Sequence, residues 1–290
     1  MLLCISSGGY RLLRGAETFP PGLRFPSPAQ TFPKRRMVNI VDLPEDILLD
    51  VLTWVPAKDL VLSCRLVCSH WRDLVDLPTP WKRKCQKEGF YSLQLDRSVQ
   101  DWRAAYFLFS LRRNLIKNPS AEEGFNFWEI QSNGGHEWKV ETIPGDHGTD
   151  FPDPHVRKYF VTSFEACTKQ QLISLKEEGY WDQLMDEAKP AIVVHDWYAA
   201  RRDCGCSYQL SVKLLSSDYI VLEEFSPEDV VIEQWSDAEW HKVSHTFRDY
   251  PSGVRYLLFW HGGQDTQYWA GWYGVRVTNS SVTITPDVVG

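Results

Sequence analysis

The residues best suited to binding chemistry lie close to the end of the sequence. Residues 267–281, QYWAGWYGVRVTNSS, begin with two tyrosines and two tryptophans that have nothing bulkier than alanine or glycine between them. A buried strand would fill such gaps with branched residues, so this spacing predicts ring faces that are open to a ligand. Tyr268 and Trp269 form an adjacent pair, and Ala270 with Gly271 leaves room beside their rings. The segment therefore predicts a stacking site.

Three carboxylates suggest a second kind of chemistry. Two carboxylates that flank a sugar can hydrolyse its glycosidic bond, and Asp203 with Glu165 or Asp265 is the candidate pair here. The sequence holds no Gly-x-Ser-x-Gly nucleophile motif, and its histidines show no metal-ligand spacing. A glycan-processing enzyme is thus an alternative, while a binding protein without catalytic residues is the favoured hypothesis.

The seven cysteines predict neither a disulfide framework nor a metal site. Their number is odd and their spacing does not repeat, which is typical of reduced thiols in a cytosolic protein. Cys204 and Cys206 lack the second pair of ligands that a zinc site needs. We therefore expect no metal, no cofactor and a cytoplasmic location.

The charge distribution argues against a nucleic-acid partner. Residues 1–36 carry six basic residues and one acidic residue, which leaves 25 basic against 37 acidic residues in the rest of the 290-residue chain. A chain that is acidic beyond residue 36 and has no long basic run there is not expected to bind a polyanion such as nucleic acid. No apolar run approaches the length of a membrane span, so we also expect no membrane insertion.

The elements that must position these residues fall into four stretches. We predict a disordered leader over 1–36, small helices over 37–84, a helical linker over 85–118 and an antiparallel β-sandwich, jelly-roll-like, over 119–286. The leader is rich in proline, glycine, serine and arginine and has little apolar periodicity. The fold class is therefore α+β with more than one domain.

The helical stretch shows apolar residues at helical spacing. Pro44, followed by two acids, marks a helix start, and Pro56 ends that helix. Two apolar stripes run through the stretch: Ile47, Leu48, Val51, Leu52 and Val55, and then Leu60, Cys64, Val67, Trp71 and Leu74. So small a helical unit buries little by itself, and we expect a partner to cover exposed apolar surface.

Beyond Pro119 the spacing of apolar residues shortens towards every second position, which indicates strands. The candidate strands are 157–163, 191–197, 207–215, 229–235, 239–247, 254–260 and 275–285. Clusters such as SNGGHE, RRDCG and HGGQD predict turns between these strands. One short helical insertion is expected near EEGYWDQLMDEA. The edge loops of such a sandwich are where a binding site would lie.

Both halves of the sequence resemble a known family. LPEDILLDVLTWVPAKDLVLSCRLVCSHWRDL is similar to an F-box, and residues 120–286 resemble the associated domain of the sugar-recognising F-box proteins, through KYFVTSFEAC and HGGQDTQYWAGWYGVRVTNSS. The resemblance implies a non-catalytic substrate receptor of an SCF ubiquitin ligase, bound to the Skp adaptor and through it to cullin and RING subunits. It implies adaptor contacts at Leu43, Pro44, Ile47, Leu48, Leu60, Val67 and Trp71.

The same resemblance implies a sugar pocket in the edge loops of the sandwich. The matching positions are Phe164, Asp203, Tyr268 and Trp269, which would grip the inner chitobiose of high-mannose glycans on misfolded glycoproteins. An indole covers the apolar face of a pyranose well, and a carboxylate accepts hydrogen bonds from its polar groups. Relatives can carry a lysine where this chain has Ala270. Recognition of a protein surface instead of a sugar is therefore the alternative.

Overall fold

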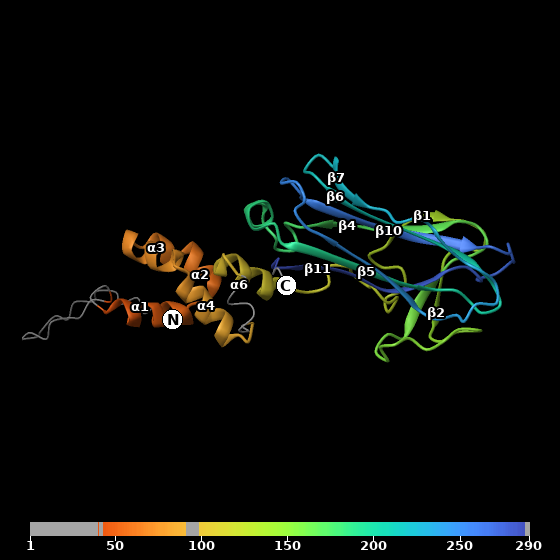
Figure 1. Ribbon diagram of the computed structural model, residues 1–290, viewed down its shortest axis with the longest axis horizontal. Helices are drawn as coiled ribbons and strands as arrows, with labels where there is room; N and C mark the ends of the chain where they lie inside the picture. The colour runs from red at the N-terminus through yellow and green to blue at the C-terminus, as the bar shows by residue number, and fades with distance from the viewer. Residues whose placement is uncertain (1–39, 41–42, 91–98, 288–290) are drawn as a thin grey trace, which may run out of the picture. The chain divides into compact units, whose positions relative to one another are not determined.

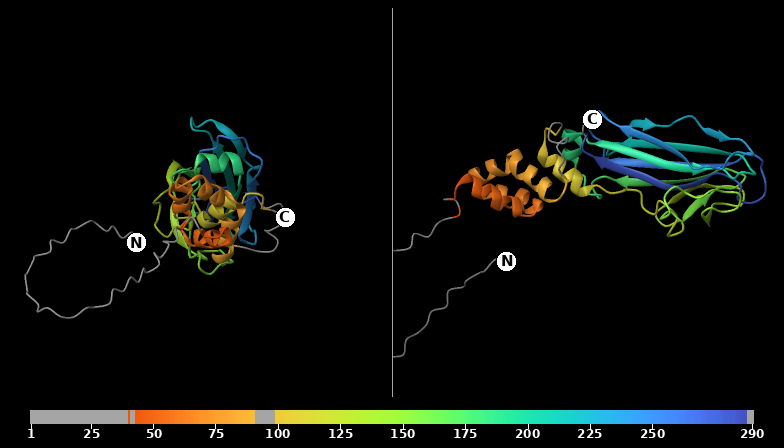
Figure 2. Two further views of the ribbon diagram at one scale, coloured as in Figure 1. Left: turned by 90° about the vertical axis from the view of Figure 1, so that its left-hand side faces the viewer. Right: turned by 60° about the horizontal axis from the view of Figure 1, so that its bottom comes forward.

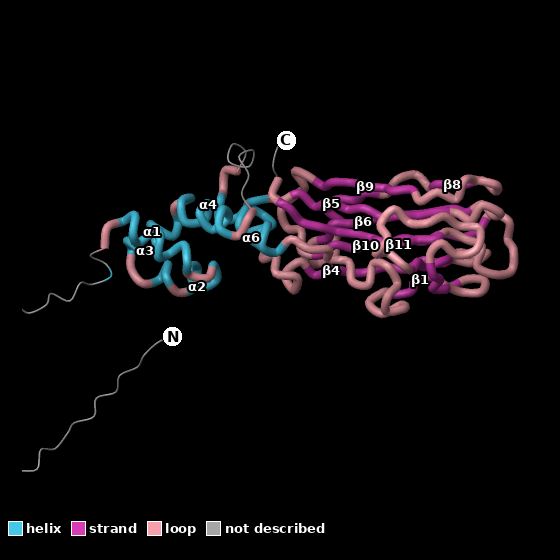
Figure 3. The backbone as a smooth tube through the Cα atoms, turned by 90° about the horizontal axis from the view of Figure 1, so that it is seen from below, coloured by secondary structure: helices cyan, strands magenta, loops and turns pink. Residues whose placement is uncertain are grey.

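The computed structural model describes residue 40 and residues 43–90 and 99–287 (Figure 1). The predicted leader, residues 1–36, lies outside the described residues. The described chain has helices first and strands afterwards, as Figure 3 shows in cyan and magenta. This order confirms the predicted class of an α-helical unit followed by an antiparallel sandwich.

The helices of the first half are short. They are α1 (Glu45–Trp54), α2 (Ala57–Leu62), the 3-10 helix η2 (Cys64–Leu66), α3 (Ser69–Asp76), α4 (Pro78–Lys87) and α6 (Trp102–Leu111). Pro44 takes the N-cap of α1 and Pro56 that of α2, because a proline ring fits the start of a helix and cannot continue a preceding one. The two prolines therefore mark the helix boundaries that the sequence predicted.

Helices α4 and α6 pack through aromatic rings. The Trp81 side chain is 1% exposed, and its indole donates a hydrogen bond to the carbonyl of Val75 at 2.7 Å. The rings of Tyr106 and Phe107 on α6 lie 5.7 and 5.5 Å from the Trp81 ring. These contacts give the helical unit a small aromatic core.

The last helix of the predicted linker ends earlier than expected. Helix α6 ends at Leu111, and residues 112–118 that follow it are not helical. The Asn114 side chain donates to the Ser280 carbonyl at 2.9 Å, and the Leu115 amide donates to the Val282 carbonyl at 2.8 Å. Leu115 and Ile116 are buried in the sandwich core. Residues 114–117 thus bond to the sandwich or pack in it, and the helix of the linker predicted over 85–118 does not extend to residue 118.

The second half contains the short π-helix η3 (Leu184–Ala188), where the helical insertion was expected, and otherwise strands in two antiparallel sheets (Figure 2). The strands are β1 (Glu129–Asn133), β2 (Lys139–Thr142), β3 (Lys158–Val161), β4 (Cys167–Ser174), β5 (Ala191–Ala199), β6 (Cys206–Leu215), β7 (Val221–Phe225), β8 (Val230–Ile232), β9 (His241–Phe247), β10 (Tyr256–Asp265) and β11 (Arg276–Thr285). One sheet has the order β1-β4-β10-β6-β7, with β8 also paired to β6, and the other has the order β2-β3-β11-β5-β9.

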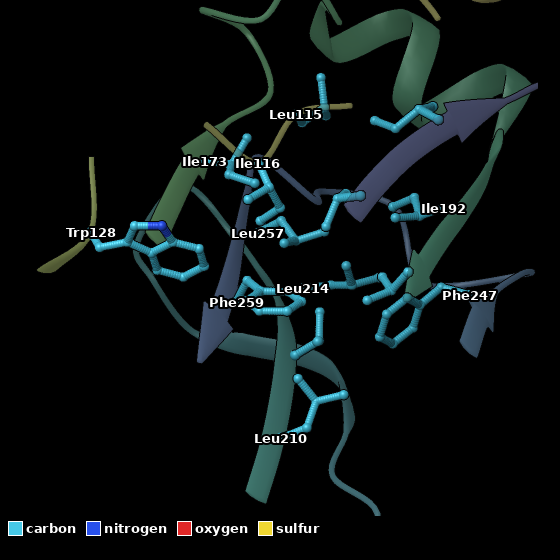
Figure 4. Packing of buried hydrophobic residues seen from close by; sticks show 14 of the residues in the cluster. Leu115, Ile116, Trp128, Ile173, Ile192, Leu210, Leu214, Phe247, Leu257 and Phe259 are labelled. Atoms are coloured by element: carbon cyan, nitrogen blue, oxygen red, sulfur yellow. The ribbon is translucent and has the colours of Figure 1, made fainter. Parts of the chain in front are cut away.

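The inner faces of the two sheets form one apolar core. Figure 4 shows Leu214, Leu257 and Phe259 from one sheet near Ile192 and Phe247 from the other. Their alternation along each strand is what a half-buried sheet requires. A second, smaller cluster contains Phe151, Tyr159, Val161, Ala199 and Trp240.

Two of the predicted strand boundaries were wrong. The segment expected to be strand over 229–235 forms only β8, and Trp235, with a φ of +70°, lies beyond the end of that strand. The HGGQD cluster, expected to be a turn, belongs to β10. A Cβ on Gly262 would lie 2.1 Å from the Cys167 carbonyl oxygen, and one on Gly263 would lie 1.9 Å from that of Ser207. The glycines thus allow close strand approach and do not mark a turn.

A polar network crosses the core and joins both sheets. The Asp196 carboxylate of β5 accepts hydrogen bonds from the hydroxyls of Tyr208 on β6 and Ser280 on β11, each at 2.7 Å. It also accepts from Nδ1 of His261 on β10 at 2.6 Å. This bond leaves Nε2 of a neutral imidazole as an acceptor for the Lys169 amine of β4, at 2.6 Å. Lys169, Asp196 and His261 are all fully buried.

Removal of the central carboxylate charge should destabilise the sandwich. We expect Asp196→Asn to lower the free energy of unfolding by about 2 kcal/mol, because an amide cannot accept all of these buried donors. Urea unfolding of the full chain, followed by tryptophan fluorescence, measures the change. Asp229→Asn is the matched control, since that carboxylate accepts from Gln209 at the surface, and its unfolding free energy should stay within about 0.5 kcal/mol of the parent value. Equal effects of the two substitutions would contradict this role of the network.

Acid should weaken the sandwich through His261. Burial and the nearby Lys169 amine lower the pKa of His261 to about 4 from its ordinary 6.5. Between these values the unfolded chain binds a proton that the folded chain does not, so stability is full above pH 6.5 and falls as the pH falls. We expect a loss of about 1.5 kcal/mol between pH 6.5 and 5. His261→Gln should flatten this part of a stability-versus-pH curve, and an unchanged slope would contradict the assignment.

Candidate functional site

Helix α1 carries apolar side chains on two faces. Leu48, Leu49 and Leu52 are buried inside the helical unit. Ile47 and Val51 are 42% and 41% exposed. A helix of an isolated soluble domain normally needs only one apolar stripe, so the second stripe suggests a surface that a partner covers.

A second group of exposed apolar side chains follows at the end of α2 and in η2. Leu62 is 58% exposed, Leu66 73% and Val67 60%. We call Ile47, Val51, Leu62, Leu66 and Val67 the exposed apolar group of the helical unit. Each of these side chains would gain about 1.5 to 3 kcal/mol on full burial against a partner.

The positions predicted to contact an adaptor differ in how far their side chains are buried. Pro44 and Val67 are exposed with Ile47, and Leu43 and Trp71 are half-buried. Leu48 and Leu60 are both 0% exposed and belong to the interior of the helical unit. In this conformation the fold itself covers both side chains, and their contact with the adaptor stays a prediction.

Strand register brings several loops to one end of the sandwich. Cys167 pairs with Asn133 and Gly263, while Cys206 pairs with Asp265 and Ile232, so these residues mark the same ends of their strands. In the other sheet, Val161 and Ala199 both pair with Arg276. We call this the loop end of the sandwich; its loops are 134–138, 162–166, 200–205, 233–240 and 266–275.

All four predicted sugar-binding positions lie on loops of this end. Phe164 belongs to the β3–β4 loop, Asp203 to the β5–β6 loop, and Tyr268 and Trp269 to the β10–β11 loop. Backbone bonds join the three loops: the Asp265 amide donates to the Ser163 carbonyl, and the Thr266 amide to the Gly205 carbonyl, each at 3.0 Å. The fold thus gathers positions that lie up to 105 residues apart in the sequence.

The Tyr268 and Trp269 rings are exposed, as the spacing of small residues predicted. Tyr268 is 69% exposed and Trp269 is 39% exposed. Trp269 meets Tyr273 edge-on, with ring centroids 5.5 Å apart, which fixes one edge of the indole. An exposed ring held by an intramolecular contact loses little conformational freedom when a ligand stacks on it.

Asp265 shapes the loop that carries these rings. Its carboxylate is fully buried and accepts hydrogen bonds from the amides of Gln267, at 2.9 Å, and Tyr268. These bonds hold Tyr268 at a φ of +55°, a conformation that costs a residue with a side chain some free energy. Burial raises the pKa of Asp265 above its ordinary value. Its role in the structure is to set the loop.

Asp203 is held by an arginine that the sequence analysis did not single out. Arg201 donates to both Asp203 oxygens, at 2.9 and 3.1 Å, and this contact lowers the pKa of Asp203 below its ordinary value. The Arg201 guanidinium also lies 4.6 Å from the centre of the Tyr273 ring. A bidentate pair leaves lone pairs on a carboxylate, so the ionised Asp203 can still accept bonds from a ligand.

The surroundings of Phe164 include two further aromatic residues. The His136 and Phe164 rings meet edge-on at 5.4 Å. The Trp272 indole donates to the carbonyls of His136 and Glu137, each at 3.2 Å. Lys139 lies over the Trp272 ring at 4.2 Å. Trp272 was visible in the aromatic segment, whereas His136 carries no sequence signal because only the fold brings it here.

The carboxylates proposed for glycoside hydrolysis have other roles in this structure. Asp265 is fully buried and bonds to backbone amides, so it does not face a ligand. Glu165 is exposed and accepts from the Gly135 amide at 3.0 Å. The pair of Asp203 and Asp265 therefore does not fit a hydrolytic site.

Within residues 43–90 and 99–287, no group of three or more His, Cys, Asp or Glu side chains is arranged to hold a metal ion. Among the helices of the described part of the chain, none has both the length and the apolar character to cross a bilayer.

Comparison with known proteins finds matches to both halves. Residues 40–83 match the F-box domain and residues 106–284 match the F-box associated region. Human F-box only protein 6 is 61% identical over 255 residues, covering 88% of this chain and 87% of that protein. Human F-box only protein 44 is 59% identical over 250 residues, covering 86% and 98%. The solved structure of TmCBM61 with β-1,4-galactotriose aligns with 60% of this chain and 99% of its own, at 18% identity and a TM-score of 0.36.

Proposed function

Because this chain belongs to the F-box proteins that carry an F-box-associated region, we propose that it is a substrate-recognition subunit of an SCF ubiquitin ligase. The F-box would bind the Skp adaptor through the exposed apolar group and through Leu43, Pro44 and Trp71. Cullin and RING subunits would follow through that adaptor. The chain itself would supply proximity, which turns ubiquitin transfer into an effectively intramolecular event.

The substrate would be a glycoprotein held at the loop end of the sandwich. Phe164, Asp203, Tyr268 and Trp269 would contact the inner chitobiose of a high-mannose, asparagine-linked glycan. The observation that carries this proposal is the exposed Tyr268–Trp269 pair on a loop that the buried Asp265 holds in place. A rigid aromatic surface beside an ionised carboxylate suits a sugar, which offers an apolar ring face and a polar edge.

Such a receptor would act where high-mannose glycoproteins meet the ubiquitin system. We propose a cytoplasmic location and a role in the disposal of misfolded glycoproteins from the endoplasmic reticulum.

Titration calorimetry with chitobiose tests the sugar site. The full chain, co-expressed with the Skp adaptor, should bind one chitobiose in a saturable manner, and free mannose is the control ligand that should give no heat of binding. Absence of chitobiose binding at high micromolar sugar would contradict the proposal.

Recognition of a protein surface is the second candidate function. Ala270 is exposed beside the rings and offers no side-chain donor to a sugar, which favours this alternative. The two functions differ in one measurement: binding of a denatured glycoprotein before and after enzymatic removal of its glycans. Equal affinity for both forms would favour the protein surface, and loss of binding after deglycosylation would favour the sugar.

A further inference from the structure

Trp235 is an exposed indole on the connection between β8 and β9. It is 72% exposed, the highest value among the described tryptophans of the sandwich. Its backbone has a φ of +70°, a conformation that is rare for a bulky side chain. The packing of the core does not account for this ring, because most of its surface faces solvent. An exposed indole that is kept in an unfavourable backbone conformation is a candidate contact for a ligand.

The backbone beside Trp235 is joined to the loop that carries Asp203. The Trp235 amide donates to the Arg202 carbonyl at 2.8 Å, and the Gln234 side chain donates to the Asp203 carbonyl at 2.9 Å. Two residues further along, the Gly205 carbonyl accepts from the amide of Thr266. The Asp203 loop therefore contacts the Trp235 segment and also the segment that leads to Tyr268 and Trp269.

Charged residues lie close to Trp235 in the sequence, and another lies in the loop that its backbone contacts. Glu233, Asp237 and Arg202 are all exposed. Trp235 thus has exposed charged residues on its own segment and on the contacting loop, and Trp269 shares the loop end of the sandwich with Asp203 and Arg201. This composition suits a ligand with an apolar ring face and many hydroxyls better than it suits an apolar peptide.

We propose that Trp235 is a second stacking platform, which contacts a sugar residue beyond the chitobiose in the same glycan. This inference rests on the proposed function, because it assumes that chitobiose occupies the site formed by Phe164, Asp203, Tyr268 and Trp269. Asp203 and its loop would then lie between the two stacking positions. The ligand class is a branched oligosaccharide with several pyranose rings, and chitobiose alone would not reach Trp235.

The test compares two sugars on one set of variants. The full chain with the Skp adaptor is titrated with chitobiose and with the pentasaccharide in which three mannoses extend it. The parent chain should bind the pentasaccharide about three- to tenfold more tightly, the gain expected from one aromatic contact. Trp235→Asn removes the indole and retains a residue that tolerates positive φ. It should remove this gain and leave the affinity for chitobiose unchanged.

Two further variants show what the ring contributes. Trp235→Tyr keeps an aromatic face and should restore most of the gain. Tyr219→Ala removes an exposed tyrosine from the β6–β7 turn, beyond the far end of the β10–β6 pair, and should bind both sugars as the parent does. Co-elution of each variant with the adaptor and an unchanged melting temperature would show that the fold persists.

The outcomes separate this inference from the proposed function. Binding of chitobiose by the parent chain, together with an unchanged pentasaccharide affinity in Trp235→Asn, overturns only the second platform. An equal loss for both sugars also overturns it, because Trp235 would then shape the chitobiose site itself. Failure of the parent chain to bind either sugar overturns both proposals. An Asn variant that keeps its sugar affinities but binds a glycopeptide less tightly would assign the ring to the peptide instead.

Discussion

Replacement of Leu66 and Val67 by aspartate should abolish co-purification of the chain with the Skp adaptor. These side chains are 73% and 60% exposed, so the substitution leaves the interior of the helical unit untouched. In a docked complex it would remove two apolar contacts and place two charges at an apolar interface. We expect a loss of affinity of at least about a thousandfold, or about 4 kcal/mol, in a pull-down or a titration with purified adaptor.

A buried leucine gives the matched control for this experiment. Leu48→Ala changes a side chain that is 0% exposed and should lower the free energy of unfolding by about 2 to 5 kcal/mol. The Leu66 and Val67 double variant should instead keep its melting temperature within a few degrees of the parent value. Retention of the adaptor by the double variant would show that the F-box binds through other residues.

Substitution of Trp269 by alanine should weaken chitobiose binding by at least about tenfold. The indole is 39% exposed, and its edge contact with Tyr273 fixes the ring that a pyranose would cover. Loss of a stacked ring removes about 0.5 to 1.5 kcal/mol of binding free energy from the stacking itself. The binding free energy that came from burial of the ring's apolar area is lost in addition. Retention on chitobiose resin and calorimetric titration measure the change.

Tyr219→Ala is the control variant for Trp269→Ala. Tyr219 is 56% exposed and lies next to the paired ends of β6 and β10 opposite the loop end, about 30 Å from it by the rise of a ten-residue strand. It should retain full sugar binding, and both variants should still co-elute with the adaptor. Full chitobiose binding by Trp269→Ala would place the pocket elsewhere on the sandwich.

Much of the fold was predictable because local signals agree with the final structure. Pro44 and Pro56 mark helix starts through the geometry of proline, which no distant contact needs to enforce. Strands such as β5 and β6 were found near their observed positions because their apolar pattern matches a sheet with one buried face.

The errors in the predicted fold come from contacts between distant segments. The expected helix over 112–117 is displaced by bonds from Asn114 to the strand around Ser280. The glycine pair in β10 predicts a turn when the sequence is considered alone. Only the structure shows that the carbonyls of Cys167 and Ser207 on the neighbouring strands approach these glycines closely. Strands β1, β2, β4 and β7 were missed.

The candidate site was only partly visible in the sequence. The exposure of Tyr268 and Trp269 followed from the small residues beside them, and Phe164 and Asp203 came from the family resemblance. Arg201 stands two residues before Asp203, but only the structure shows that it donates to both carboxylate oxygens. The buried network of Lys169, Asp196 and His261 has no local signature, because each residue lies on a different strand.

A reconstituted ligase tests most directly whether one chain joins a ligase-binding helical unit to a glycan-binding sandwich. The chain is assembled with Skp, cullin and RING subunits and supplied with ubiquitin, a denatured high-mannose glycoprotein, and the same protein after enzymatic deglycosylation. We expect ubiquitination of the glycosylated form only, with inhibition by free chitobiose. Equal ubiquitination of both forms, unaffected by chitobiose, would contradict it.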